Sequence, residues 1–355
     1  MKKLIIISLQ LVMSLLVGLF IGNIIMPLKA PEKVDTLKKI DSIDLTKAES
    51  IETTSNHIDE DLKTFSPYTG QILEAEAIEN IPFMCIVENS KDARPQSGLS
   101  EADIIYETMA EGGIPRFLAV FYENSPKVIG PVRSVRPYFI DLSREHELPF
   151  AHCGGSAEAL ATISSDDSLN SINEISTGAP FWRDNARKAP HNLYTSAENV
   201  RNFIISNNYQ YSKESHFDFL DNALLDSNNY ASNLSMDLSN YYKTSYKYIN
   251  GFYEKYMDGK LATDKNTGEA LKFKNIVVQI TDMSLQSDNT HIDIDLVGEG
   301  PGYILTNGKI EKINWSKDNV NSKTKLLTED GAPLKLSRGN TIWHIVDKNS
   351  NLNFN

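Results

Sequence analysis

The longest hydrophobic segment stands at the start of the chain. Leu4 to Leu28 contain no charged residue, and Lys2 and Lys3 precede them. A membrane-spanning helix needs about 20 such residues, whereas a cleaved signal peptide has roughly 7–15 and then a small-residue cleavage site, which is lacking here. We therefore expect residues 1–28 to form a transmembrane anchor or an uncleaved signal. The two lysines favour a single-pass membrane protein whose remaining residues lie outside the cytoplasm.

Residues 29–65 show no hydrophobic periodicity. They are rich in charged residues, Ser and Thr, and Ala30 to Thr64 contain no aromatic residue. Such a composition cannot bury enough apolar surface to offset the entropy of ordering the chain. We expect a disordered stalk.

Between residues 66 and 228, strand-like and helix-like patterns alternate. Residues 82–89 and 116–123 have the apolar runs of buried strands. Residues 102–111 fit either a strand or a short helix capped by Ser100, and we favour the strand. Helix starts are predicted at Pro137, Ser156 and Ser196. This alternation predicts an α/β domain with a mixed sheet and covering helices.

From residue 230 to residue 350 the pattern changes to short alternating strands. Asn250-Gly251 stands between two aromatic, alternating runs, which is a strong signal for a hairpin. Gly-rich turns separate the later runs, such as "NIVVQITDM" and "NTIWHIV". We expect a second, smaller and mainly β domain.

The overall charge narrows the possible partners. The formal net charge is −12, which argues against nucleic acid and against electrostatic docking on anionic lipid. No cofactor is indicated.

The stretch "FAHCGGSAEAL" (150–160) predicts a strand that turns into a helix through Gly154-Gly155. Such a turn can present free backbone N–H groups at the positive end of the helix dipole, with Ser156 as cap or donor. Glycine lets the backbone approach a ligand closely. The turn is therefore suited to a carboxylate, a phosphate or a developing oxyanion.

Basic residues are frequent in the neighbouring sequence. Arginine suits carboxylate or phosphate because its planar fork donates two parallel hydrogen bonds. The candidate ligand-binding residues are Arg133, Arg136, Gly154, Gly155, Ser156, Arg187 and Asn192, with Arg183 nearby. Alternatively, the arginines pair with local acids such as Asp141, Glu145 or Asp184.

His152 and His191 are the candidate catalytic residues. A general base would be drawn from this pair, because the "APHN" loop can return over the strand that ends at His152. Cys153 is an unsuitable partner for His152, since neighbouring residues on a strand point to opposite faces. "GGSAE" is not a G-x-S-x-G nucleophile elbow.

The cysteines and the metal signals are weak. Cys85 and Cys153 fit two separate buried thiols, although a disulfide or a reactive Cys153 stays open. His291, Asp293 and Asp295 could hold an ion but fit an exposed edge strand better. "TDKNTGE" lacks the full calcium pattern and fits a turn.

Several motifs resemble one bacterial family. They are "ARPQSGLSEADIIYE", "GGIPRFLAVF", "IGPVRSVRPYF", "HCGGSAEA", "RKAPHNLYTS", "GFYEKYMDGK" and "GEGPGYILTNGKI". Together they cover most of residues 66–346 and resemble the YerB-like lipoproteins, a two-domain family of unknown function. The resemblance implies a tethered protein of a Gram-positive-type cell envelope. The N-terminal segment lacks a lipid-accepting cysteine, and Cys153 stands where relatives would carry a small residue such as alanine.

Three interpretations follow. The first is an anchored protein that binds an anionic envelope ligand, such as peptidoglycan, an anionic polymer or another envelope protein. The second is an envelope hydrolase or transferase with a histidine base. The third is a structural scaffold whose arginines are all paired.

Overall fold

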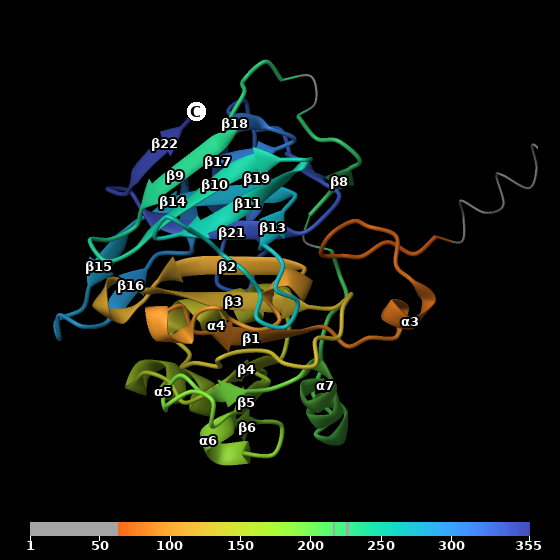
Figure 1. Ribbon diagram of the computed structural model, residues 1–355, viewed down its shortest axis with the longest axis vertical. Helices are drawn as coiled ribbons and strands as arrows, with labels where there is room; N and C mark the ends of the chain where they lie inside the picture. Colours follow the sequence, from red (N-terminus) through yellow and green to blue (C-terminus); the bar gives the residue numbers. More distant parts are fainter. Residues whose placement is uncertain (1–62, 216, 225–226) are drawn as a thin grey trace, which may run out of the picture. The chain divides into compact units, whose positions relative to one another are not determined.

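The computed structural model describes residues 63–215, 217–224 and 227–355 (Figure 1). The described residues belong to one compact unit. The predicted anchor (1–28), and the predicted stalk (29–65) except for its last three residues, lie outside the described residues. No helix among the described residues has the length and apolar character needed to cross a membrane.

A ten-stranded mixed sheet forms the centre of this unit. Its strands, in spatial order, are β19 (Lys325–Leu327), β18 (Lys309–Lys317), β17 (Gly298–Thr306), β14 (Asn275–Thr281), β21 (Thr341–Asp347), β2 (Ile104–Met109), β3 (Pro115–Phe121), β1 (Phe83–Val87), β4 (Phe150–His152) and β5 (Ser171–Asn173).

Strands from both halves of the chain share this sheet. β2 and β21 pair in parallel, with Tyr106 opposite Trp343. Both strands are buried along almost their whole length, as expected for parallel strands covered on both faces. The sequence predicts the strands, but pairing between positions so far apart depends on the fold as a whole.

A second sheet covers one face of the central one. It consists of β12 (Lys260–Leu261), β11 (Phe252–Met257), β10 (Lys243–Ile249), β9 (Asn233–Asp237) and β22 (Asn351–Phe354), with β13 (Lys272–Phe273) paired to β11. Alternate side chains of β9–β11, such as Met236, Tyr246 and Tyr253, are buried in the core that also contains Ile105 and Phe117. The C-terminal part is thus mainly β, as predicted, and the predicted hairpin is present, with Ile249 opposite Phe252.

The described residues also form α-helices. They are α3 (Ala75–Ile78), α4 (Pro137–His146), α5 (Ala157–Ser165), α6 (Glu174–Thr177) and α7 (Ala197–Ser206). Pro137 is in the first turn of α4, and Ser156 and Ser196 cap α5 and α7 with their hydroxyls. These three predicted helix starts are therefore confirmed, as is the strand at 102–111.

Short paired strands complete the described part. They are β6 (Trp182–Arg183) with β7 (Leu193–Tyr194), β8 (Phe219–Leu220) with β20 (Leu336–Ser337), and β15 (Met283–Leu285) with β16 (Ile292–Ile294). The β6–β7 pair carries the loop that contains His191.

Candidate functional site

The predicted site residues gather along one edge of the central sheet. β1, β4 and β5 run parallel, and β2 runs in the same direction because both β1 and β2 are antiparallel to β3. Their carboxyl ends therefore share an edge, which is where ligands collect in open α/β sheets. Residues 129–135 cross this edge, since the Arg133 amide bonds to Ile86 and the Arg133 carbonyl accepts from Cys153.

His152 is fully buried, and both its ring nitrogens are occupied. Nδ1 lies 2.8 Å from the Gly154 carbonyl oxygen and Nε2 lies 2.7 Å from the Ser171 hydroxyl. The carbonyl can only accept, so Nδ1 carries the proton and Nε2 accepts from Ser171. Burial lowers the pKa of His152 to about 4. The ring fits a structural part of the turn, because neither nitrogen is free to take a proton from a substrate.

The Gly154-Gly155 turn is also bonded internally. The Gly154 amide donates to Asn173 Oδ1 at 2.8 Å, and the Ser156 amide donates to the Val135 carbonyl at 3.3 Å. The Ser156 hydroxyl accepts from the Ala159 amide. These donors are not available to an anion, although the sequence correctly predicts the turn and its cap.

Arg136 and Arg187, two of the predicted ligand-binding residues, bind other parts of the protein. Arg136 is paired with Glu111, which also binds Arg116. Arg187 donates to the Ala93 and Pro95 carbonyls at 2.6 and 2.7 Å.

Asn192 accepts from Arg183, whose guanidinium also pairs with Glu174. The predicted local acids Asp141 and Glu145 instead bind Arg144 and Lys317. The arginines are thus largely paired, but with partners that are distant in sequence or on other elements.

Arg133 and His191 do meet, at a carboxylate that the sequence prediction missed. Glu88 Oε1 lies 2.9 Å from His191 Nδ1, 3.6 Å from Arg133 Nε and 2.7 Å from the Ser90 hydroxyl. The Glu88 side chain is only 6% exposed, and its Oε2 has no hydrogen-bond partner within the described part of the chain. Glu88 directly follows β1, and this position could have indicated a site residue. A prediction that looks for an anion-binding site does not select a carboxylate, however.

Neither cysteine nor metal chemistry is favoured. Cys85 and Cys153 are free thiols. Burial, together with the hydrogen bond to Glu174, raises the pKa of Cys153 to about 11. His291 pairs with Asp288, and the described residues contain no group of three or more His, Cys, Asp or Glu side chains placed to hold a metal.

The residues "TDKNTGE" (263–269) form a tight turn, closed by a bridge between Thr263 and Ala270.

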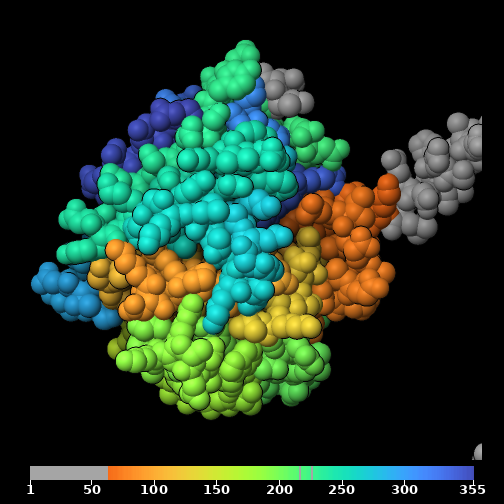
Figure 2. Space-filling view, in the orientation of Figure 1, coloured from red at the N-terminus to blue at the C-terminus, as the bar shows by residue number. Residues whose placement is uncertain are grey.

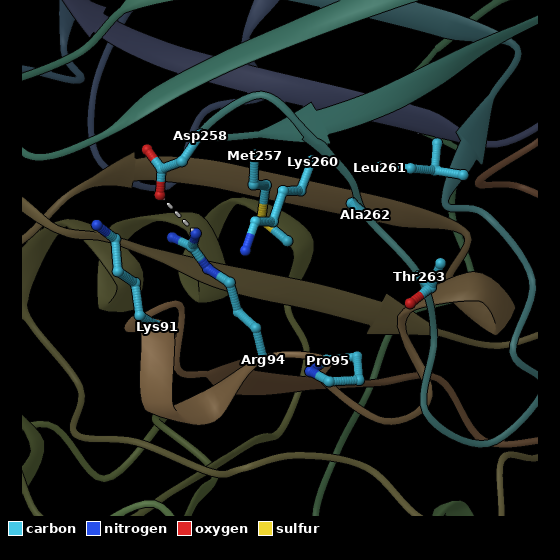
Figure 3. A pocket seen from close by; sticks show the side chains of 9 residues that line it. All are labelled: Lys91, Arg94, Pro95, Met257, Asp258, Lys260, Leu261, Ala262 and Thr263. Carbon is cyan, nitrogen blue, oxygen red and sulfur yellow. Dashed lines mark hydrogen bonds and ion pairs between the residues drawn. The ribbon is translucent and has the colours of Figure 1, made fainter.

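A hollow of about 460 Å³ lies beside the segment that follows β1 (Figure 3). We call it the basic hollow. It is lined by Lys91, Arg94, Pro95, Met257, Asp258, Lys260, Leu261, Ala262 and Thr263. Three cationic side chains thus face one carboxylate in a protein of net charge −12. The sequence does not predict this site, because single lysines carry no distinctive motif.

The cations of the basic hollow differ in how they are bonded. Arg94 is held by Asp258 at 2.8 Å and by the backbone and side chain of Asn89 (Figure 3). Lys91 and Lys260, in contrast, form no ion pair with any described residue, and both are exposed. Burial acts to raise the pKa of Asp258, but Arg94, the Lys243 amide and the charge of Lys91 outweigh it and lower the pKa.

Both halves of the chain build the basic hollow. Residues 91–95 come from the first half and residues 257–263 from the second. The following turn ties them together, since the Lys265 amide donates to the Gln96 carbonyl at 2.7 Å. Figure 2 shows the cyan segment around residues 258–270 lying against the orange segment near residue 90.

A buried ion pair is connected to the basic hollow by hydrogen bonds. Glu107 on β2 and Lys255 on β11 are 2.7 Å apart and both fully buried. The Asn89 amide group donates to the same Glu107 carboxylate. Asn89 therefore connects Arg94 of the basic hollow to the charged pair between the two sheets.

Comparisons with known proteins agree with this architecture. Residues 68–210 match the model described as "Protein of unknown function (DUF3048) N-terminal domain", and residues 233–343 match its C-terminal domain. A Bacillus subtilis (strain 168) protein named "Putative lipoprotein YerB" is 32% identical over 291 residues, which cover 80% of this chain and 86% of that protein. A crystal structure of the YerB protein from Bacillus subtilis has a TM-score of 0.74 and 31% identity, covering 82% of this chain and all of the other. The chain therefore belongs to the two-domain DUF3048 family that includes YerB.

Proposed function

We propose that this protein is a membrane-tethered, extracytoplasmic protein that binds an anionic component of the cell envelope in the basic hollow. The tether is supported by the uncharged segment Leu4–Leu28 and by the name of the relative, which describes a lipoprotein. The domain boundaries 66–228 and 230–350 belong to the same proposal.

The observation that carries the binding function is the pair of ammonium groups of Lys91 and Lys260, which no described residue pairs with. Each ammonium has three hydrogen-bond donors and no acceptor, so an anionic ligand is its natural partner. The lysine ammonium is also a point charge, so it can donate to a phosphate or a carboxylate that approaches from any of several directions. Arg94 adds a third positive charge whose position is fixed by Asp258 and Asn89.

The remaining lining suits a ligand that is only partly charged. Pro95, Met257, Leu261 and Ala262 supply apolar surface next to the cations. A peptide of peptidoglycan or a polyol phosphate polymer combines an anionic group with carbon chains that such a surface can cover. Pockets of this mixed kind commonly orient a ligand by a few polar groups.

A binding experiment tests the function. The full-length protein in detergent is titrated with soluble poly(glycerol phosphate) and, separately, with soluble peptidoglycan fragments. We expect the double variant Lys91→Glu/Lys260→Glu to bind at least one of them about 100-fold more weakly, because two attractions become repulsions.

The matched control is Lys127→Glu/Lys335→Glu, which changes the net charge equally at exposed lysines outside the basic hollow. It should bind within about twofold of the unaltered protein, since distant surface charges are screened by salt. Equal losses in both variants, or no binding to either probe, would contradict the proposal and favour the scaffold interpretation.

A further inference from the structure

We propose that His191 is the acid–base residue of an esterase centre that cleaves a carboxylic ester whose anionic group is held by the basic hollow. The inference rests on the proposed binding function, because the basic hollow supplies the cations that hold this substrate. It assigns separate roles to three residues: His191 moves the proton, Glu88 positions His191, and Arg133 stabilises developing negative charge.

The hydrogen bond between His191 and Glu88 selects the tautomer of the ring. A carboxylate oxygen accepts, so His191 Nδ1 carries the proton and donates across 2.9 Å. The lone pair then lies on Nε2, where a general base needs it. The nearest carboxylate oxygen to Nε2 belongs to the exposed Asp92 and is 3.9 Å away. Nε2 is therefore open to a water molecule.

Glu88 is well placed to stabilise the imidazolium that forms when Nε2 takes a proton. Its side chain is 6% exposed, and its Oε2 has no hydrogen-bond partner among the described residues. The Ser90 hydroxyl donates to Oε1 and helps to fix the carboxylate. A buried carboxylate that orients a histidine is the arrangement used in catalytic triads.

Arg133 supplies a cation at the same oxygen of Glu88 that His191 contacts. Its Nε lies 3.6 Å from Glu88 Oε1, and its side chain is 28% exposed. The two terminal nitrogens of Arg133 make no hydrogen bond within the described ranges of the chain. They are available for an oxyanion, which a preorganised donor stabilises more than it does a neutral carbonyl.

The centre adjoins the basic hollow through one short turn. Lys91, which lines the basic hollow, and Asp92, which faces His191, are neighbours in the same 3-10 turn. Consecutive Cα atoms are about 3.8 Å apart. Arg187 holds this turn by donating to the Ala93 carbonyl. A ligand anchored at Lys91 is thus bound to the same short turn whose next residue, Asp92, faces His191.

The reaction balances with water as the only co-reactant. His191 Nε2 takes a proton from water while the water oxygen bonds to the ester carbonyl carbon, and the carbonyl electron pair moves to oxygen beside Arg133. The intermediate then re-forms the carbonyl and breaks the bond to the alcohol oxygen. The imidazolium returns its proton to that oxygen, which leaves one carboxylic acid and one alcohol.

The test uses mono(4-nitrophenyl) suberate, an anionic ester whose hydrolysis releases 4-nitrophenolate and whose carboxylate is too far along the chain to attack its own ester readily. We expect His191→Asn in the full-length protein to lower kcat about 100-fold or more, in the range of a lost general base. The matched control is His291→Asn, which removes another half-buried histidine paired with a carboxylate, Asp288. It should leave the rate within about twofold, because it lies outside the proposed machinery.

The positioning role of Glu88 has its own readout. Glu88→Gln should lower kcat about tenfold or more with KM nearly unchanged, because it leaves the hydrogen bond but removes the charge that stabilises the imidazolium. Thermal unfolding of both variants checks that they fold. A rate of wild-type protein equal to buffer, or full activity of His191→Asn, would overturn the inference.

The two proposals fail in different ways. Binding of poly(glycerol phosphate) or peptidoglycan fragments, with no cleavage of the nitrophenyl ester above the buffer rate, rejects only the esterase. Ester cleavage that is lost in His191→Asn but has the same KM in Lys91→Glu/Lys260→Glu rejects the basic hollow as the substrate site.

Discussion

The Gly154-Gly155 turn and the basic hollow lie in the same protein but use their polar groups in opposite ways. At the turn, the Gly154 amide and both nitrogens of His152 are bonded to groups of the protein itself. At the basic hollow, Lys91 and Lys260 form no ion pair with any residue that the structure describes. A distinctive local sequence can therefore belong to a structural element, while residues without any motif can be available to bind a ligand.

The same contrast holds for the two histidines. His152 is fully buried, and its two ring nitrogens form hydrogen bonds with Ser171 and Gly154. The side chain of His191 is 23% exposed, and its Nδ1 contacts Glu88 while its Nε2 has no hydrogen-bond partner among the described residues. Substitutions at the turn should therefore change stability without changing binding. Substitutions at the basic hollow should do the reverse.

The largest effect on stability is expected from breaking the buried ion pair between Glu107 and Lys255. Lys255→Met removes the ammonium partner of the buried Glu107 carboxylate and leaves it with its other hydrogen-bond partners, such as Asn89 and Tyr242. An uncompensated buried charge should lower the free energy of unfolding by about 3–5 kcal/mol. Urea unfolding measures it, with the exposed Lys335→Met as control. A loss below that of the control would mean that the pair does not hold the sheets together.

The next effect is the acid sensitivity of the turn. The pKa of His152 falls from its ordinary 6.5 to about 4 in the folded state, so unfolding takes up a proton between these values. Stability is then fully present above about pH 6.5 and decreases by about 3 kcal/mol as the pH falls through 4.

Urea unfolding of wild-type protein and His152→Asn at several pH values between 7 and 4 measures this contribution. The difference between the two free energies of unfolding should shrink as the pH falls. Parallel pH curves would show that His152 does not titrate as its burial predicts.

A smaller effect is expected from added bulk in the turn. A Cβ on Gly155 would lie 2.8 Å from Val135 Cγ1, a buried side chain that cannot move away easily. Gly155→Ala should therefore lower the free energy of unfolding by about 2 kcal/mol. Gly112→Ala, where φ is +70° and no atom lies within 4 Å, should cost only about 1 kcal/mol from backbone strain. If Gly155→Ala also weakened ligand binding, the turn would be more than structural.

The smallest effect is expected from removing one cation of the basic hollow. Lys91→Gln should weaken ligand binding by about 1 kcal/mol and reduce its dependence on salt. The free energy of unfolding should change by less than about 0.5 kcal/mol, because the side chain is exposed and forms no ion pair within the described part of the chain. Titration at two salt concentrations, with Lys127→Gln as control, checks both parts. An unchanged salt dependence would remove Lys91 from the site.

The sequence predicts the local elements well because their signals are local. Pro137, the Ser156 and Ser196 caps and the Asn250-Gly251 turn each specify their own few residues, and all are found where expected. The pairing of β2 with β21 is different, because Tyr106 and Trp343 meet only when the whole sheet forms.

The site was harder to predict for the same reason. Arg133 and His191 were both selected, but the buried carboxylate that joins them, Glu88, stands far from His191 in sequence. Lys91 and Lys260 likewise come together only when the two halves of the chain fold onto each other. A residue's type suggests its chemistry, whereas its availability depends on partners that the fold supplies.

Lysine acetylation in the presence of ligand tests the binding site most directly. The full-length protein is treated with acetic anhydride with and without saturating poly(glycerol phosphate) or peptidoglycan fragments, and each lysine is quantified by mass spectrometry. If the basic hollow is the site, bound ligand slows acetylation of Lys91 and Lys260 and leaves Lys127 and Lys335 unchanged. Tight binding with Lys91 and Lys260 still fully reactive would place the ligand elsewhere and contradict the account.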